Sequence, residues 1–145
     1  MNVLKVCSQF PIYVGWSEKL QCRGVFAQEN IANNQIVETC PTIMIPHTSE
    51  ENRLNRHAAG NLLNNYYYDW DKKYWCLPLG FGMLYNHSYT PNMDYLYDTK
   101  NALIQYVAIR DIHKDEELTV NYNGEPSDQT NIDTWFHEVA GKNFI

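Results

Sequence analysis

The sequence has no apolar run that approaches the roughly 20 residues required of a transmembrane helix. Its opening segment, residues 1–6, is too short to act as the hydrophobic part of a secretory signal. These two absences argue against membrane insertion and export. We therefore expect a soluble, intracellular protein without a membrane partner, located in the cytoplasm or, for a viral or effector protein, in the nucleus of a host.

Positive charge is also scarce. The chain has 11 Lys and Arg residues against 17 Asp and Glu residues, which gives a formal net charge of -6 at pH 7. Because phosphate contacts depend on clustered cations, this balance argues against direct nucleic-acid binding. An acidic surface attracts basic partners, so the expected partner is a basic protein or peptide, and a histone tail or a ribosomal protein would fit equally.

Cysteine and histidine are too dispersed to form a metal centre. The five histidines have neither an H-x-x-x-H nor an H-x-H spacing. The cysteines lie far apart without a C-x-x-C pair, so they predict neither a zinc knuckle nor a disulfide framework; they are Cys7, Cys22, Cys40 and Cys76. We expect no metal and no metal-dependent catalysis.

The chain does have enough apolar and aromatic material for one core. Its 145 residues are 44% hydrophobic and 14% aromatic, which fits a single domain spanning residues 1–145. Short stretches rich in β-branched and aromatic residues alternate with turn-forming residues, a pattern typical of a mainly β fold with short helices. Strands are expected at Val3–Val6, Gly24–Ala27, Ile36–Cys40, Tyr66–Trp70, Tyr74–Leu77, Met93–Tyr97, Ala102–Ile109 and Leu118–Tyr122.

Local signals add one hairpin and two helices to this pattern. The segment Asp98-Thr99-Lys100-Asn101 favours a tight reversal between two of the expected strands. Ser49, followed by acidic residues and then by apolar residues at helical spacing, predicts a capped helix that reaches Leu63 and is weakened at Gly60. A second helix is expected at residues 131–140, with apolar groups on one side from Ile132, Trp135, Phe136 and Val139.

Two motifs carry the chemical information in the sequence. The first is Asn86-His87-Ser88-Tyr89-Thr90-Pro91-Asn92, and the second is Glu116-Glu117-Leu118-Thr119-Val120-Asn121-Tyr122. The first follows an uncharged segment, residues 79–85, whose glycines let the backbone approach a ligand closely. A buried Asn and His there need hydrogen-bond partners, either from the protein, where the pair would cap a turn, or from a bound molecule. The acidic run 115–117 is expected to form a solvated turn.

Together these motifs resemble the paired signature of SET-domain protein-lysine methyltransferases. The resemblance covers nearly the whole chain, in the manner of minimal, single-domain bacterial or viral members. It implies a SET-domain fold of small curved sheets, with a core at residues 3–124 and a C-terminal pseudoknot, and it implies S-adenosylmethionine as the cofactor. No cysteine follows Cys76 to build the zinc segment of larger enzymes, so the tail helix is expected to close the cofactor pocket. Trp135 would then cover the adenine, or would simply anchor the tail to the core.

The family pattern also assigns cofactor contacts to individual residues. The side chain of Asn86 would hold the amino-acid end of the cofactor, and the main chain of His87 would meet the edge of the adenine. The main chains of Arg23 and Gly24 would contact the methionine part, because they match a Gly-x-Gly turn of the family. The first glycine of that turn is Cys22 here, so we expect an ordinary φ at this position or a locally altered turn.

The catalytic centre is expected at Tyr122, which would also contact the cofactor and would orient the lysine amine and the methyl donor. Ionising a phenol at pH 7 costs about 4 kcal/mol, so we expect hydrogen bonding and not general-base catalysis. Tyr95 corresponds to a tyrosine that faces the lysine nitrogen in relatives with a similar Asn-His-Ser-aromatic-Thr-Pro-Asn run. Val120 stands where many members have a Phe or Tyr that controls methyl number, so Tyr95 is expected to take that role and to favour monomethylation.

Two other functions fit the sequence. One is a SET-like module that binds the cofactor or a lysine peptide without turnover, an interpretation that Cys22 favours and Tyr122 opposes. The other is a β-rich interaction protein whose resemblance is accidental, which would require both motifs to coincide by chance. The sequence does not determine the substrate protein, the target lysine, the number of methyl groups transferred or the oligomeric state.

Overall fold

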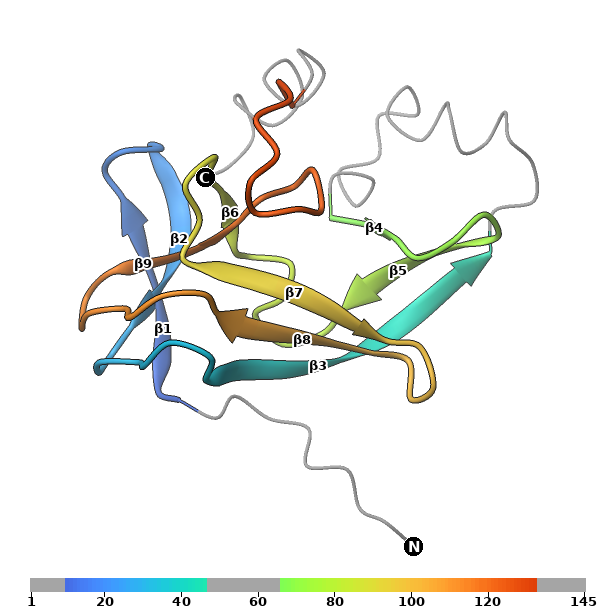
Figure 1. Ribbon diagram of the computed structural model, residues 1–145, viewed down its shortest axis with the longest axis horizontal. Coiled ribbons are helices and arrows are strands. Elements are labelled where there is room, and N and C mark those ends of the chain that lie inside the picture. Colours follow the sequence, from blue (N-terminus) through green and yellow to red (C-terminus); the bar gives the residue numbers. More distant parts are fainter. Residues whose placement is uncertain (1–9, 47–65, 133–145) are drawn as a thin grey trace, which may run out of the picture.

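The computed structural model describes residues 10–46 and 66–132, and within these ranges the chain contains strands and no α-helix (Figure 1). The strands form two sheets. The four-stranded sheet has the order β1-β2-β9-β6, with β1 Ile12–Ser17, β2 Cys22–Ala27, β9 Glu117–Val120 and β6 Asn86–His87. The five-stranded sheet has the order β4-β5-β3-β8-β7, with β4 Tyr68–Asp69, β5 Tyr74–Pro78, β3 Ile36–Pro46, β8 Leu103–Ala108 and β7 Met93–Asp98.

The five-stranded sheet is antiparallel and supplies much of the core. The expected hairpin is present as β7 and β8, and its turn is closed by the amide of Asn101, which donates to Asp98 Oδ1 at 3.1 Å. Along β8 buried and half-buried side chains largely alternate, as expected for a strand that faces the core on one side. Fully buried residues from both sheets belong to one cluster, among them Val25, Met93, Ile104, Tyr106 and Leu118.

The two motifs of the sequence meet in a parallel strand pair. Asn86 lies opposite Thr119, and His87 lies opposite Val120. After β9 the chain runs alongside the loop that follows β6, where Gln129 Nε2 donates to the carbonyl oxygen of Tyr89 at 2.9 Å and the amide of Ile132 donates to Tyr89 Oη at 2.8 Å. Figure 1 shows β6 and this C-terminal segment at the same end of the molecule. The arrangement fits the expected pseudoknot.

The strand predictions are confirmed in the centre of the chain and inaccurate at several boundaries. The strand expected at Ile36–Cys40 continues to Pro46, because β5 pairs with its second half. The strand expected at Tyr66–Trp70 is reduced to Tyr68–Asp69. The sequence predicts neither β1 nor β6. β1 pairs with β2 over its whole length, and β6 is too short to produce a local sequence pattern.

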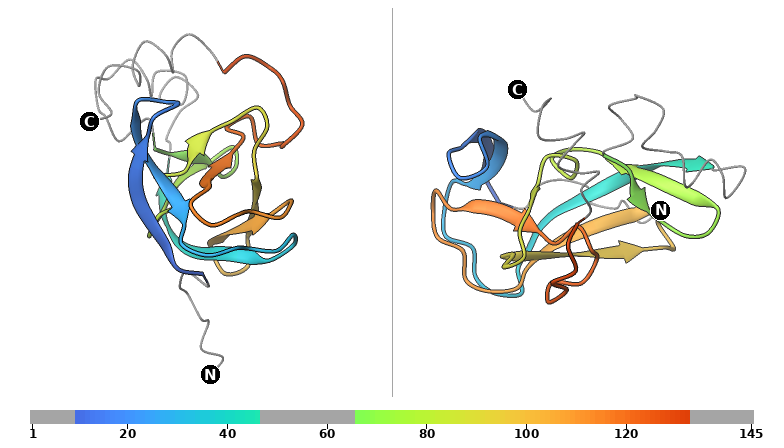
Figure 2. Two further views of the ribbon diagram at one scale, coloured as in Figure 1. Left: turned by 90° about the vertical axis from the view of Figure 1, so that its left-hand side faces the viewer. Right: turned by 90° about the horizontal axis from the view of Figure 1, so that it is seen from above.

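Other predicted elements fall outside the described residues. These are the strand Val3–Val6, the helix from Ser49 to Leu63 and, apart from residues 131 and 132, the tail helix at 131–140. Both described sheets curl, as the two views of Figure 2 show, so the expected mainly β architecture of curved sheets is confirmed. Among the described residues no helix has the length and apolar character needed to span a membrane.

Candidate active site

Asn86 connects three strands of the small sheet. Its side-chain nitrogen Nδ2 donates to the carbonyl oxygen of Arg23 on β2 at 2.9 Å and to Glu117 Oε1 on β9 at 2.7 Å. The side chain is half-buried, and its orientation is set by the protein itself. The structure thus brings together three of the expected cofactor-binding residues, because Gly24 lies beside the same contact: a Cβ at Gly24 would stand 3.0 Å from Asn86 Nδ2.

Cys22 begins β2 with an ordinary backbone conformation. The left-handed residue of the preceding turn is Gln21, with φ of 54°, and Cys22 is not among the residues with positive φ. The expectation of an ordinary φ at Cys22 is therefore confirmed. Its Sγ lies 3.7 Å from Asn86 Oδ1, and burial, followed by the nearby Glu117 carboxylate, raises the pKa of the thiol above its usual value. Cys22 is consequently a neutral thiol at pH 7.

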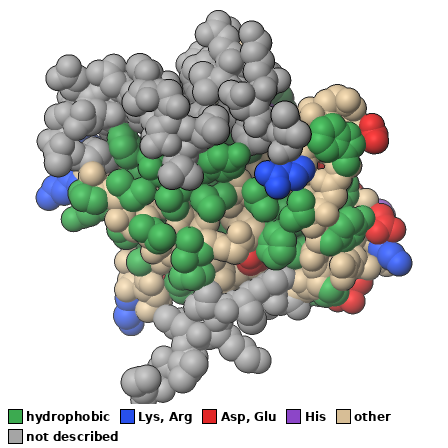
Figure 3. Space-filling model, turned by 180° about the vertical axis from the view of Figure 1, so that it is seen from behind, with side chains coloured by type: hydrophobic (Ala, Val, Ile, Leu, Met, Phe, Trp, Pro, Cys, Tyr) green, Lys and Arg blue, Asp and Glu red, His purple; other side chains and the backbone are tan. Residues whose placement is uncertain are grey.

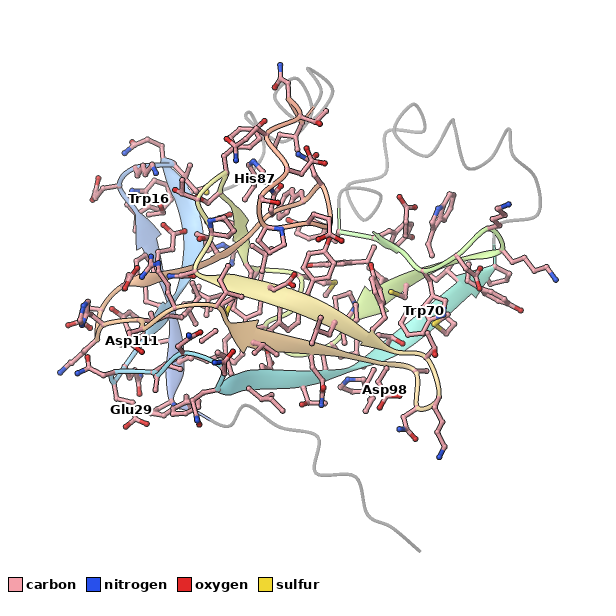
Figure 4. All side chains as sticks on the ribbon, viewed as in Figure 1. Trp16, Glu29, Trp70, His87, Asp98 and Asp111 are labelled. Carbon is pink, nitrogen blue, oxygen red and sulfur yellow. The ribbon has the colours of Figure 1, made fainter. Side chains whose placement is uncertain are left out.

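His87 ties β6 to the segment that follows β9. Its Nδ1 accepts a hydrogen bond from the backbone amide of Tyr122 at 3.1 Å. The imidazole also meets the ring of Tyr89 edge-on, with centroids 4.4 Å apart, and lies 5.3 Å from the ring of Tyr122. Because Nδ1 acts as the acceptor, the neutral imidazole carries its proton on Nε2. Figure 4 shows His87 close to the segment that follows β9.

Tyr122 is held at both ends. Its backbone amide donates to His87, and its hydroxyl donates to the carbonyl oxygen of Tyr85 at 2.8 Å. Burial is the largest cause that raises the pKa of Tyr122 above its ordinary value, and Cys22 and Tyr66 contribute further. The phenol therefore stays protonated at neutral pH, and its proton is directed at a carbonyl.

Tyr95 lies on β7 with 9% of its surface exposed, close to the segment that carries Tyr122. A Cβ at Gly124, two residues beyond Tyr122, would stand 3.8 Å from Tyr95 Oη. The ring of Tyr68 meets the ring of Tyr95 edge-on at 5.1 Å. Burial, and then the carboxylate of Asp94, raises the pKa of Tyr95, so this phenol is also neutral. The expected pair of tyrosines is thus placed in one region of the molecule.

Comparison with known proteins identifies the fold and the family. A family model described as the SET domain matches residues 22–123, which include β2, both motifs and Tyr122. The chain is also 35% identical over 118 residues to a histone-lysine N-methyltransferase of Schizosaccharomyces pombe described as specific for lysine 37 of H3, covering 81% of this chain and 72% of that protein. The chain belongs to the SET-domain family of protein-lysine methyltransferases. The resemblance seen in the sequence is confirmed.

Solved structures support the same assignment. A candidate histone methyltransferase of Plasmodium falciparum is 33% identical to this SET domain, with a TM-score of 0.61, and the match covers 79% of this chain and 99% of that one. A structure described as the basis for the product specificity of histone lysine methyltransferases is 22% identical, with a TM-score of 0.62, covering 86% of this chain and 56% of that one. This second likeness concerns the fold alone.

The loop that carries the Tyr85 carbonyl is anchored from beneath by Glu38. A bulge between Ile36 and Glu38 interrupts the pairing of β3 with β8, and the carboxylate of Glu38 is almost fully buried. Its Oε2 accepts from Tyr85 Oη at 2.6 Å, and its Oε1 accepts from the amide of Phe81 at 3.0 Å. The position of the Tyr85 carbonyl, and with it the hydroxyl of Tyr122, therefore depends on a residue far from the motifs.

Sequence reasoning missed two contributors to this SET-domain site. Glu38 had no signal beyond an acidic residue inside an apolar strand, a pattern that could have suggested a buried carboxylate. The sequence predicts a solvated acidic turn that includes Glu117, and this prediction is wrong, since Glu117 begins β9 and its carboxylate binds Asn86 and Ser17. Asp115 does occupy the turn, with φ of 65°. Trp135 lies outside the described residues.

Proposed function

We propose that this SET domain transfers a methyl group from S-adenosylmethionine to the ε-amine of a lysine in a basic protein or peptide, and that it mainly transfers one methyl group. The observation that supports this proposal most directly is the parallel pairing of β6 with β9. It places Asn86, the expected cofactor residue, opposite Thr119, three residues before Tyr122, and the hydroxyl of Tyr122 donates a hydrogen bond to the carbonyl oxygen of Tyr85. One cofactor and one amine could then meet between the two motifs.

The residues around Asn86 suit the amino-acid end of S-adenosylmethionine, which when bound supplies the methyl group as part of a sulfonium. Both protons of Asn86 Nδ2 are directed at protein oxygens, so the side chain offers its Oδ1 as an acceptor, which matches an ammonium group. Gly24 has no side chain, which lets the Glu117 carboxylate and Asn86 Nδ2 approach its backbone closely. We assign the main chains of Arg23 and Gly24 to the methionine part, that of His87 to the adenine, and Trp135 to the closing tail.

The amine must lose its proton before it can act as a nucleophile. Free lysine has a pKa of about 10.4, so presenting the neutral amine at pH 7 costs about 4 to 5 kcal/mol. Burial among tyrosines favours the neutral form, because desolvation disfavours an ammonium. We propose that this proton leaves to water before the amine is enclosed, since Tyr122 and Tyr95 are both neutral phenols and have no capacity to accept it as bases.

Tyr122 then acts by orientation. A phenol oxygen whose proton is directed at a carbonyl interacts with further groups as an acceptor, so it can receive an N–H of the amine and align the nitrogen lone pair with the methyl group. Tyr95 would hold the same nitrogen from β7 and occupy the space that further methyl groups need. This arrangement is the basis of the proposed preference for monomethylation.

The decisive experiment compares the native chain with Tyr122→Phe, using labelled S-adenosylmethionine and a panel of basic proteins. We expect Tyr122→Phe to lower the rate of transfer about 100-fold, because misorientation of a reacting pair typically has that effect. Cofactor binding, measured by calorimetry, should change little. Tyr74→Phe, which removes an exposed phenol on β5, is the matched control and should behave as wild type.

Two results would contradict the proposal. Methyl transfer at the wild-type rate by Tyr122→Phe would show that Tyr122 has no catalytic role. Cofactor binding by the native chain without transfer to any basic protein would favour a module that binds without turnover.

A further inference from the structure

The carboxylate of Glu117 lies at the point where all four strands of the small sheet converge. Glu117 begins β9, its Oε2 accepts from Ser17 Oγ at the end of β1 at 2.6 Å, and its Oε1 accepts from Asn86 Nδ2 on β6 at 2.7 Å. It also occupies the space beside Gly24 on β2, since a Cβ built there would overlap Glu117 Oε1. Ser17 is only 2% exposed, so this end of the carboxylate is shielded from water.

The contact between Glu117 Oε1 and Asn86 Nδ2 determines the orientation of the side-chain amide of Asn86. Nδ2 has two protons, and they are directed at the carbonyl oxygen of Arg23 and at Glu117 Oε1. Rotating the amide by 180° would place Oδ1 against these two oxygens, neither of which has a proton to donate. Asn86 Oδ1 is therefore fixed on the opposite side, where the thiol of Cys22 lies at 3.7 Å.

We infer that Glu117 is a positioning residue for the cofactor, acting through Asn86. The inference rests on the proposed function, in which Asn86 Oδ1 accepts from the ammonium of S-adenosylmethionine. Ser17 anchors the carboxylate, the carboxylate orients the amide, and the amide presents its acceptor to the ammonium. The negative charge of Glu117 also lies on the far side of the amide, where it polarises the amide and favours a positively charged ligand.

The absence of a side chain at Gly24 has a specific reason in this arrangement. Its φ is not in the left-handed region, so the backbone conformation alone does not require glycine. What excludes a side chain is the Glu117 carboxylate and, 3.0 Å away, Asn86 Nδ2. The position of the Glu117 carboxylate therefore depends on glycine at position 24.

The experiment uses Glu117→Ala, Glu117→Gln, Asn86→Ala and the double variant Glu117→Ala/Asn86→Ala. Glutamine can still accept from Asn86 through Oε1 while its Nε2 donates to Ser17, so Glu117→Gln keeps the orientation and removes the charge. Glu29→Gln, which removes an exposed carboxylate in the loop after β2, is the control for net charge. Thermal melting establishes that each variant is folded before other measurements are compared.

The first readout needs no cofactor. The resonances of the two side-chain amide protons of Asn86 are assigned by comparing nuclear magnetic resonance spectra, because they are absent in Asn86→Ala. We expect its protons to exchange slowly in wild type, Glu117→Gln and Glu29→Gln, and faster in Glu117→Ala. Should Glu117→Ala fail to fold, Ser17→Ala releases the same carboxylate from its anchor and should also speed exchange. Equal exchange rates in wild type and in the folded variants would overturn the inference.

The second readout is the affinity for S-adenosylmethionine by calorimetry. Loss of a charge-assisted contact predicts a Kd about ten-fold higher in Glu117→Ala, with a smaller increase in Glu117→Gln. Because Glu117 acts through Asn86, the double variant should bind no more weakly than Asn86→Ala alone. Additive losses would show an independent role and overturn the inference. If the native chain bound no cofactor while the exchange result held, the proposed function would fail and the orientation of Asn86 by Glu117 would stand.

Discussion

Tyr122 and Tyr95 differ in how their hydroxyl groups are held, and this difference suggests different tasks. The hydroxyl of Tyr122 donates to a main-chain carbonyl, and its own amide is bound to His87, so both ends of the residue are fixed. Tyr95 is fixed mainly through its ring, which packs on Tyr68 and on Tyr106. A fixed hydroxyl suits alignment of the amine, whereas a packed ring suits restriction of the space around it.

At this scale we predict a change of product in Tyr95→Phe. Removing the hydroxyl takes away one contact to the amine and opens room beside it, so dimethylated and trimethylated products should increase in mass spectra of the substrate. Tyr74→Phe is the control, because it removes an exposed phenol on β5. A product distribution that is unchanged in Tyr95→Phe would refute the assignment of Tyr95 to methyl-number control.

The segment between β5 and β6 is an irregular element whose shape is set by side chains from other strands. Glu38 binds the amide of Phe81 and the hydroxyl of Tyr85, while Tyr68 and Tyr106 both donate to the carbonyl of Gly82 at 3.0 Å. Backbone groups that lack partners in a regular sheet are thereby satisfied by buried side chains. The Tyr85 carbonyl, which accepts the hydrogen bond from the Tyr122 hydroxyl, belongs to this element.

Two glycines with positive φ allow the contribution of this element to be measured. Gly80 has φ of 79° and a Cβ there would overlap Glu38 Oε1, whereas Gly124 has φ of 96° and its nearest neighbour would be Tyr95 Oη at 3.8 Å. Gly124→Ala should lower the free energy of unfolding by about 1 kcal/mol from the backbone conformation alone. Gly80→Ala should lower it by roughly 1 to 3 kcal/mol more, because its side chain also overlaps a buried carboxylate.

Urea denaturation of the two variants tests this difference, and Gly124→Ala serves as the internal control for backbone strain. Equal destabilisation by both substitutions would mean that Glu38 moves aside without loss, and that it does not fix the segment between β5 and β6.

At the scale of the whole molecule, aromatic rings within the described residues contact one another in a series. The face seen from behind in Figure 3 carries many hydrophobic side chains, with charged side chains among them as well as at its edges. Inside, a series of ring contacts connects the core to the site: Tyr85 and Tyr106 have centroids 4.6 Å apart, Tyr106 and Tyr95 6.3 Å, and Tyr95 and Tyr68 5.1 Å. The proposed catalytic region is therefore continuous with the core.

The buried tyrosines lead us to expect a loss of stability at alkaline pH. Burial is the largest cause that raises the pKa of Tyr85, Tyr95 and Tyr106. In the unfolded chain these phenols lose their protons near pH 10. Above that pH the native chain binds more protons than the unfolded chain, so the free energy of unfolding falls as pH rises, by up to about 1.4 kcal/mol per pH unit for each tyrosine. The stabilising effect is fully present below pH of about 9.

Denaturation curves from pH 8 to 11 measure this dependence. Tyr106→Phe should give a shallower decline than wild type, because one buried phenol is absent, and Tyr74→Phe should not alter the slope, because Tyr74 is exposed. Absorbance at 295 nm should show the buried phenols ionising only with unfolding. Ionisation of all the tyrosines in the folded protein near pH 10 would contradict the prediction.

The amino-acid sequence by itself determined the family, the mainly β character, the β7–β8 hairpin and the residues on which the proposed site rests. Each of these depends on short-range information: a turn at Asp98 to Asn101, apolar stretches bounded by turn residues, and two motifs of seven residues. Local preference is enough for such features, because neighbours in the chain are neighbours in space.

Only the tertiary structure decided which of these groups touch. The pairing of Asn86 with Thr119, the binding of Ser17 to Glu117 and the burial of Glu38 beneath Tyr85 join residues that lie far apart in the chain. No local pattern distinguishes Glu117, which is turned inward, from its neighbour Glu116, which pairs with Arg110 at the surface. The direction of each side chain follows from strand register, and register is fixed only when the whole set of strands packs around one core.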